Sequence, residues 1–150
     1  MRPFSLAAFL LIVLSSPFLN ANEAGTIKIS RGEASIARDG STLPASVGSQ
    51  VLVSDQIITG ADGAVGLTLR DNTRLTAGPN TTLDLNKFSF DTTTHAGAVD
   101  ASVQRGSLSV ISGKIAKASP GTVRFSTPSV TLGVRGTEFI IEVDEAEGDN

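Results

Sequence analysis

Short stretches of alternating apolar and polar residues recur along the chain, and they constrain its fold more than any other feature. Turn residues separate these stretches, and no segment of ten or more residues keeps a convincing helical period. Such alternation is typical of strands that bury one face. The sequence therefore predicts a nearly all-β fold. We expect strands over 26–30, 34–38, 50–53, 56–59, 64–70, 74–77, 81–85, 99–104, 108–112, 122–126, 130–134 and 138–143.

Turn signals lie between these expected strands. Asp71 and Asn72 separate two alternating runs, and we expect a two-residue hairpin there because both residue types tolerate positive φ. The stretch 91–98, DTTTHAGA, has no apolar anchor and is predicted to be a loop. Turns in the middle of the chain recur roughly every eight to ten residues, which is common to sandwiches, barrels and short solenoids. Spacing alone does not choose among these architectures.

The segment 127–139, TPSVTLGVRGTEF, predicts two strands joined by a shaped corner. Gly136 is expected to supply a bulge or a backbone angle that other residues avoid. In the second strand, Phe139 and Ile141 continue the apolar side. In the first strand, alternation with small and polar residues predicts one buried face, made by Val130, Leu132 and Val134.

The first 21 residues have the pattern of an export signal. Arg2 gives a positive start, residues 4–14 form an apolar run, and Ala21 offers a small-residue cleavage site. The run is too short to span a membrane, which needs about 20 residues. We expect cleavage after Ala21, no membrane insertion afterwards, one domain over 22–143 and an acidic tail over 144–150. A retained membrane anchor is the alternative. The absence of cysteine suits a bacterial periplasm, so a periplasmic or secreted protein is predicted.

Composition argues against several function classes. The net charge of −3 and the scattered basic residues argue against nucleic acid as a partner, because phosphate binding depends on clustered Lys and Arg. Trp and Tyr are absent, which disfavours sugar-binding and single-strand-binding surfaces built on flat aromatic faces.

Candidate catalytic groups lack the partners that chemistry needs. His95 is the only histidine and lies in the predicted loop, so we expect no catalytic, metal or cofactor site around it. Asp55, Asp62, Asp71 and Asp84 lie near turns, where Asp commonly bonds to its own backbone. Turn formation is the favoured interpretation of these carboxylates, and paired acid chemistry is the alternative. The sequence predicts no enzyme.

A set of motifs runs through nearly the whole chain after residue 25. The pattern begins with Gly25-x-Ile27 and Arg31-Gly32, and continues through Asp71-Asn72-Thr73. Its strongest positions are Asp55, Thr59, Gly60, Arg105, Gly106, Thr127, Pro128, Arg135, Gly136, Thr137 and Phe139. This pattern resembles the FecR domain, the extracytoplasmic module of ferric citrate regulator proteins and of many other exported proteins. The resemblance implies an all-β, solenoid-like roll, with a β-sandwich as the alternative, and motif residues that are structural.

The same resemblance implies a non-catalytic module of the bacterial cell envelope that acts in protein interaction or signalling. Its partner would be an envelope protein, and it would need no cofactor. Full-length regulators of this family add a cytoplasmic arm and a membrane helix; only residues 1–3 precede the apolar run here. We therefore expect this chain not to carry a signal across the membrane by itself. Arg135 either pairs with a carboxylate, such as Asp55 or Glu138, or contacts the partner.

Two other functions remain open at this point. An envelope glycan-binding or structural domain is the alternative to protein binding, and a hydrolase is the third possibility. An exposed strand edge would support protein binding. A groove lined by Asn, Asp and Arg would support glycan binding, whereas convergent carboxylates in a pocket would support a hydrolase.

Overall fold

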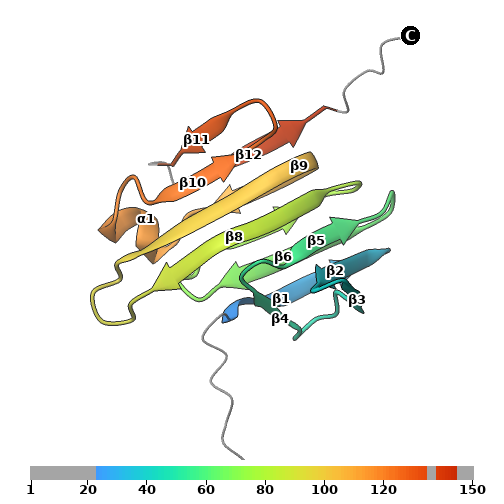
Figure 1. Cartoon of the computed structure of the whole chain (residues 1–150), viewed down its shortest axis with the longest axis horizontal. Coiled ribbons are helices and arrows are strands. Elements are labelled where there is room, and N and C mark those ends of the chain that lie inside the picture. The colour runs from blue at the N-terminus through green and yellow to red at the C-terminus, as the bar shows by residue number, and fades with distance from the viewer. Residues whose placement is uncertain (1–22, 135–137, 145–150) are drawn as a thin grey trace, which may run out of the picture.

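The computed structural model describes residues 23–134 and 138–144, which form twelve strands and one short helix (Figure 1). The predicted all-β class is confirmed. The strands are β1 (Glu23–Arg31), β2 (Ala34–Arg38), β3 (Ser41–Pro44), β4 (Gln50–Leu52), β5 (Gln56–Thr59), β6 (Ala64–Leu69), β7 (Arg74–Ala77), β8 (Thr82–Phe90), β9 (Gly97–Ile111), β10 (Val123–Ser126), β11 (Thr131–Gly133) and β12 (Glu138–Val143). The helix α1 spans Lys114–Ala118.

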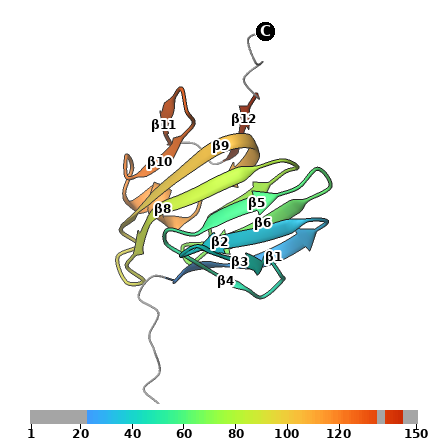
Figure 2. The same cartoon turned by 45° about the vertical axis from the view of Figure 1, so that its right-hand side comes forward.

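All twelve strands belong to one sheet that curls strongly into a half-barrel (Figures 1 and 2). Its main path runs β3-β2-β5-β8-β9-β7-β6-β1-β4, and every pair on it is antiparallel. β10 lies parallel to β9, β11 pairs with β10, and β12 pairs with β9. The solenoid-like roll implied by the family resemblance is not shown, because the strands form one continuous curled sheet.

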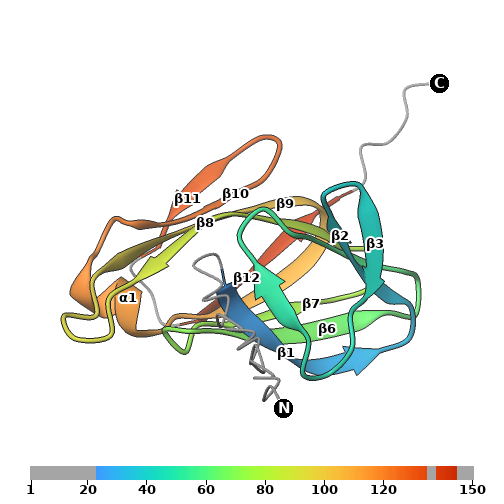
Figure 3. The same cartoon turned by 60° about the horizontal axis from the view of Figure 1, so that its bottom comes forward.

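The long strand β9 joins two halves of this sheet (Figure 3). Residues 97–105 pair with β8 and β10, and residues 106–111 pair with β7 and β12. We call the first group, with β2, β3, β5 and β11, the β8 half-sheet; the second group, with β1, β4 and β6, is the β7 half-sheet. The sequence predicted two strands here. The chain instead continues through Gly106, whose φ of 88° redirects the strand without reversing it.

Apolar side chains from both half-sheets fill the interior. Because the strands alternate, every second residue of the central strands faces inward and is buried. Phe125 is fully buried and meets half-buried Phe139 edge-on, with ring centroids 5.5 Å apart. Each fully buried Leu, Ile or Phe stabilises the fold by about 1.5–3 kcal/mol. Further core residues are Ile27, Ile36, Ile57, Leu67, Leu69, Leu75, Leu83, Leu85, Leu108 and Ile115.

The buried face predicted for residues 130–134 is wrong for two of its three members. Val130 and Leu132 are 51% and 39% exposed, and only Val134 is buried. The reason is position: β11 pairs only with β10 among the described residues, so little covers its apolar side. The apolar side of β12 is confirmed, since Ile141 is buried and Phe139 packs on the core. Gly136 lies outside the described residues.

Strand β3 was missed by the sequence reading, although a signal for it was present. Asp39 and Gly40 connect β2 to β3, and both have positive φ, 49° and 77°. An Asp-Gly pair between extended runs is a strong hairpin signal.

No helix among the described residues is long and apolar enough to cross a membrane. The predicted export signal lies outside these residues.

Candidate functional site

The motif residue Asp55 is buried and bound by Arg38. The Arg38 guanidinium donates from Nε to Oδ1 at 2.9 Å and from a terminal nitrogen to Oδ2 at 2.7 Å. The Leu52 N–H donates to Oδ2 at 2.7 Å. The hydrogen bond to Asp55 raises the pKa of Arg38. This cluster joins β2 to the turn between β4 and β5. Arg135, which we named as a possible partner of Asp55 from the sequence, lies outside the described residues.

Thr59 and Gly60 connect the end of β5 to the turn before β8. The Thr59 hydroxyl donates to the Gly78 carbonyl at 2.6 Å and accepts the Thr81 N–H at 2.8 Å. The Gly60 N–H donates to the Glu33 carbonyl at 2.8 Å. Both motif residues satisfy backbone groups where two chain reversals meet.

Gly106 allows two backbones to approach closely at the bend of β9. A Cβ at this position would lie 2.5 Å from Thr81 Cα and 2.7 Å from the Asn80 carbonyl oxygen. The neighbouring Ser107 N–H donates to the Thr81 hydroxyl at 3.0 Å. Arg105, the other half of this motif, is exposed and makes no ion pair within the described residues.

Thr127 closes the turn between β10 and β11, where Pro128 follows it. Its N–H donates to the Val130 carbonyl at 2.8 Å, and its hydroxyl accepts the N–H groups of Val130 and Ser129 at 3.1 and 3.3 Å. Arg135, Gly136 and Thr137 lie outside the described residues. The described motif residues are therefore spread over several junctions of the fold, and the structure does not bring them together in one site.

Asp71 forms a buried cluster that sequence reasoning found only in part. Its carboxylate accepts the Thr73 N–H at 3.0 Å and the Thr73 hydroxyl at 2.8 Å, which is the predicted local turn. It also accepts the Ile115 N–H at 3.2 Å, from the first turn of α1. The Gly113 N–H donates to the Thr73 hydroxyl at 3.2 Å. The carboxylate thus joins the β6–β7 turn to the helix, and we assign it a structural role.

His95 lies in the predicted loop and stacks on Phe90, with ring centroids 6.0 Å apart. The same loop is shaped by Asp91, whose exposed carboxylate accepts the backbone N–H groups of Thr94 and Thr93 at 3.0 and 2.8 Å. These hydrogen bonds lower the pKa of Asp91.

In the part of the chain that the structure describes, no group of three or more His, Cys, Asp or Glu residues could hold a metal ion.

The outer face of the β8 half-sheet carries a row of hydrogen-bonded polar side chains. Asp84 accepts from Gln56 at 2.7 Å and from Gln104 at 2.9 Å, and Asn86 donates to Asp100 at 3.2 Å. Beside this row lies a hollow of about 230 Å³, lined by Lys87, Ala98, Val99, Asp100, Gly121, Thr122 and Arg124. It brings basic and acidic groups together on an open surface.

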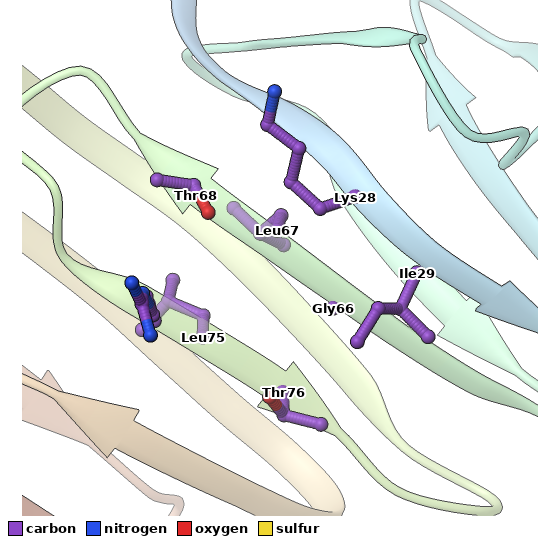
Figure 4. Close-up of a pocket in the computed structure, with 8 residues that line it drawn as sticks. Lys28, Ile29, Gly66, Leu67, Thr68, Leu75 and Thr76 are labelled. Atoms are coloured by element: carbon purple, nitrogen blue, oxygen red, sulfur yellow. The ribbon is translucent and has the colours of Figure 1, made fainter.

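The outer face of the β7 half-sheet has a second hollow, of about 290 Å³ (Figure 4). It opens over Gly66, which contributes no side chain, and Ile29 stands beside it. Lys28 and Arg74 bring two positive charges to its lining. The remaining lining residues are Leu67, Thr68, Leu75 and Thr76.

The edge of β11 leaves backbone groups without a strand partner among the described residues. The Val130 carbonyl accepts the N–H of Thr127, just after β10, and the Val134 N–H donates to the Val123 carbonyl in β10. These two hydrogen bonds fix the ladder, so Leu132 between them also points its N–H and C=O toward β10. The N–H and C=O groups of Thr131 and Gly133 consequently point away from the sheet. Both half-exposed apolar side chains, Val130 and Leu132, lie along this edge.

Comparison with known proteins identifies the family. No curated protein and no solved structure matches the chain. The family model described as FecR protein matches residues 55–150, which is more than half of the chain and includes every strongest motif position from Asp55 onward. FecR-family proteins are envelope signalling components and are generally non-catalytic. The chain belongs to the FecR family.

Proposed function

We propose that this FecR domain is a non-catalytic interaction module of the bacterial cell envelope, and that it binds an extended segment of an envelope protein along the edge of β11. The observation that carries this proposal is the edge itself. It combines outward backbone donors and acceptors at Thr131 and Gly133 with exposed apolar side chains at Val130 and Leu132. An exposed strand edge is the feature that strand addition requires.

The position of Leu132 explains how such a partner would gain affinity. Leu132 lies opposite Phe125, a fully buried core residue on β10. A strand added to β11 would place its own side chains next to Leu132, on the face that continues into the core. Backbone hydrogen bonds would fix the strand's register, and an apolar residue beside Leu132 would extend the buried surface.

Two of the other edge strands, β3 and β12, are less suited to strand addition. β3 ends in Pro44, which has no N–H to donate, and β12 carries Glu138 and Glu142. Proline and charged residues are the usual means by which proteins discourage pairing at an edge. β11 contains neither, since its sequence is Thr-Leu-Gly.

Site-specific photo-cross-linking in cells tests this proposal. A photoreactive amino acid in place of Leu132 should give an adduct with an envelope protein, and mass spectrometry should map the adduct to an extended segment. Thr131→Pro removes one outward N–H and should abolish the adduct, whereas the matched control Thr131→Val keeps the N–H and should retain it. An adduct that persists in Thr131→Pro, with the fold intact, would refute strand addition.

The cellular location is part of the same proposal. The short apolar run and the Ala21 site support export and cleavage of residues 1–21. Mass spectrometry of the protein from the periplasm and the medium should find an N-terminus near Asn22. An intact N-terminus in the membrane fraction would show an anchored protein instead.

Glycan binding remains a second candidate because of one specific surface. The hollow lined by Lys87, Asp100 and Arg124 offers hydrogen-bond donors and acceptors on the β8 half-sheet. Equilibrium binding of purified protein to envelope glycan fragments separates the two functions. Loss of glycan binding in Lys87→Ala with Arg124→Ala, but not in Thr131→Pro, would favour the glycan.

A further inference from the structure

The outer face of the β7 half-sheet gathers exposed apolar side chains around a centre of small side chains. Of six large apolar side chains exposed among the described residues, three lie here: Ile29, Ile111 and Ile140, which are 48%, 40% and 68% exposed. Ile29 and Ile140 end one cross-strand row, and small residues fill it between them: Gly66, Thr76 and Ser109. This row therefore has small side chains in the middle and a large apolar side chain at each end.

The charges on this face are separated by sign. Lys28 lies on β1 at one side of the face, Arg74 lies on the middle strand β7, and Glu138 and Glu142 lie on β12 at the other side. All four side chains are exposed, and none forms an ion pair within residues 23–134 and 138–144. The face thus has a basic side and an acidic side, neither of which is neutralised by the described part of the chain.

We propose that this face is a self-association surface, on which two copies of the chain pack face to face. A surface with both signs of charge is complementary to itself when a two-fold axis exchanges the two sides. An axis parallel to the strands does this, because it lays β12 of one copy over β1 and β6 of the other. An axis perpendicular to the strands in the plane of the interface would place like charges together, so charge selects the first arrangement.

The hollow over Gly66 supports the same arrangement. With the two-fold axis along the strands near β7 and β9, Ile140 of one copy faces the hollow of the other. A Cβ on Gly66 would lie 3.1 Å from the Ile29 Cβ, so any side chain at residue 66 would crowd the space that Ile140 enters. Glu138 then lies near the basic side, where Lys28 and Arg74 are exposed. Because the contact is symmetric, each pairing occurs twice.

The size of the face predicts a weak dimer. The five strands β1, β6, β7, β9 and β12 offer a contact area of about 500 Å² on each copy. This area is near the lower limit for a specific interface. Exposed charges contribute modestly and are screened by salt. We therefore expect a dimer that forms at high protein concentration and dissociates as salt is added.

Sedimentation velocity on the purified chain, with its N-terminus determined by mass spectrometry, tests the proposal. The wild type should pass from monomer to dimer with increasing concentration. The double variant Lys28→Glu/Arg74→Glu should weaken the dimer at least tenfold, and Glu138→Lys/Glu142→Lys should do the same. An equimolar mixture of these two variants should restore the dimer, because each then supplies the charge that the other lost.

A matched control places the same charge change on the other half-sheet. Lys87→Glu/Arg124→Glu alters two exposed basic residues there and should leave dimerisation unchanged. Thermal unfolding confirms that each variant is folded, and restoration in the mixture is itself evidence of intact faces. A wild type that stays monomeric at all accessible concentrations, a dimer insensitive to both reversals, or a mixture that stays monomeric would overturn the proposal. None of these results bears on the β11 edge, so the proposed function is tested separately.

Discussion

Replacement of Gly106 by alanine tests why β9 can bend and still connect both half-sheets. Two costs apply at this position. The φ of 88° is unfavourable for any residue with a Cβ, by about 1–2 kcal/mol. The added Cβ would also lie 2.5 Å from Thr81 Cα and 2.7 Å from the Asn80 carbonyl oxygen, and such overlap with backbone costs about 1–3 kcal/mol.

Three other glycines separate these two costs. Gly48 has a φ of 90° but open space around its Cβ position. Gly113 lacks a positive φ, but its Cβ would overlap the Asp71 carbonyl oxygen. Gly133 has neither feature. The four alanine variants therefore cover every combination of the two costs. Gly106→Ala carries both costs, Gly48→Ala only the positive φ, Gly113→Ala only the overlap, and Gly133→Ala neither.

The expected changes follow from adding the costs and subtracting the gain from a less flexible unfolded chain, about 0.4–1 kcal/mol. Gly106→Ala should lower the free energy of unfolding by about 2–4 kcal/mol, a large share of a typical total of about 5–15 kcal/mol. Taken from the middle of these ranges, Gly48→Ala should lower it by about 0.8 kcal/mol and Gly113→Ala by about 1.3 kcal/mol. Gly133→Ala should leave it unchanged or raise it by about 0.5 kcal/mol.

Urea unfolding followed by circular dichroism measures these differences, provided that the slope of the free energy with urea is the same for all variants. If Gly106→Ala costs no more than Gly48→Ala, the close backbone approach to Thr81 contributes nothing and the steric part of the reasoning is wrong. If Gly48→Ala is as stable as Gly133→Ala, the positive φ carries no measurable cost.

Asp71→Ala should lower the free energy of unfolding by about 3 kcal/mol, because it leaves buried N–H groups without an acceptor; faster hydrogen exchange at the Ile115 amide would show that the link to α1 is lost. Arg38→Ala should cost about 3 kcal/mol by leaving the buried Asp55 carboxylate without its cation, and adding Asp55→Asn should recover part of that loss in the same urea assay. Asp91 has a lowered pKa, so its loop contacts should be present above the ordinary carboxyl pKa and should be lost as the pH falls through the lowered value. Amide chemical shifts of its loop, followed by NMR against pH, check this.

Local patterns in the sequence determined most of the strands and one important turn. Alternation alone placed most strands close to their observed bounds, because burial of one strand face needs only a period of two. It missed β3, divided β9 in two and ended β8 five residues early. A turn at Asp71-Asn72 was also predicted, and the structure has one there, in which Asn72 has a φ of 69°. The predicted two-residue length is wrong, because residues 70–73 connect β6 to β7. These features depend on residues near one another in the chain, so the sequence carries them directly.

Tertiary structure decided which strands are covered and which distant groups meet. Val130 and Leu132 have the same alternation as buried strands, yet they are exposed because β11 lies at an edge. The contact between Asp71 and Ile115 joins residues 44 positions apart, and no local pattern reveals it. Likewise, the separation of charge on the β7 half-sheet exists only because β9 pairs with β7 along one edge and with β12 along the other. Burial and charge complementarity depend on what lies opposite a residue, and only the order of strand pairing determines that.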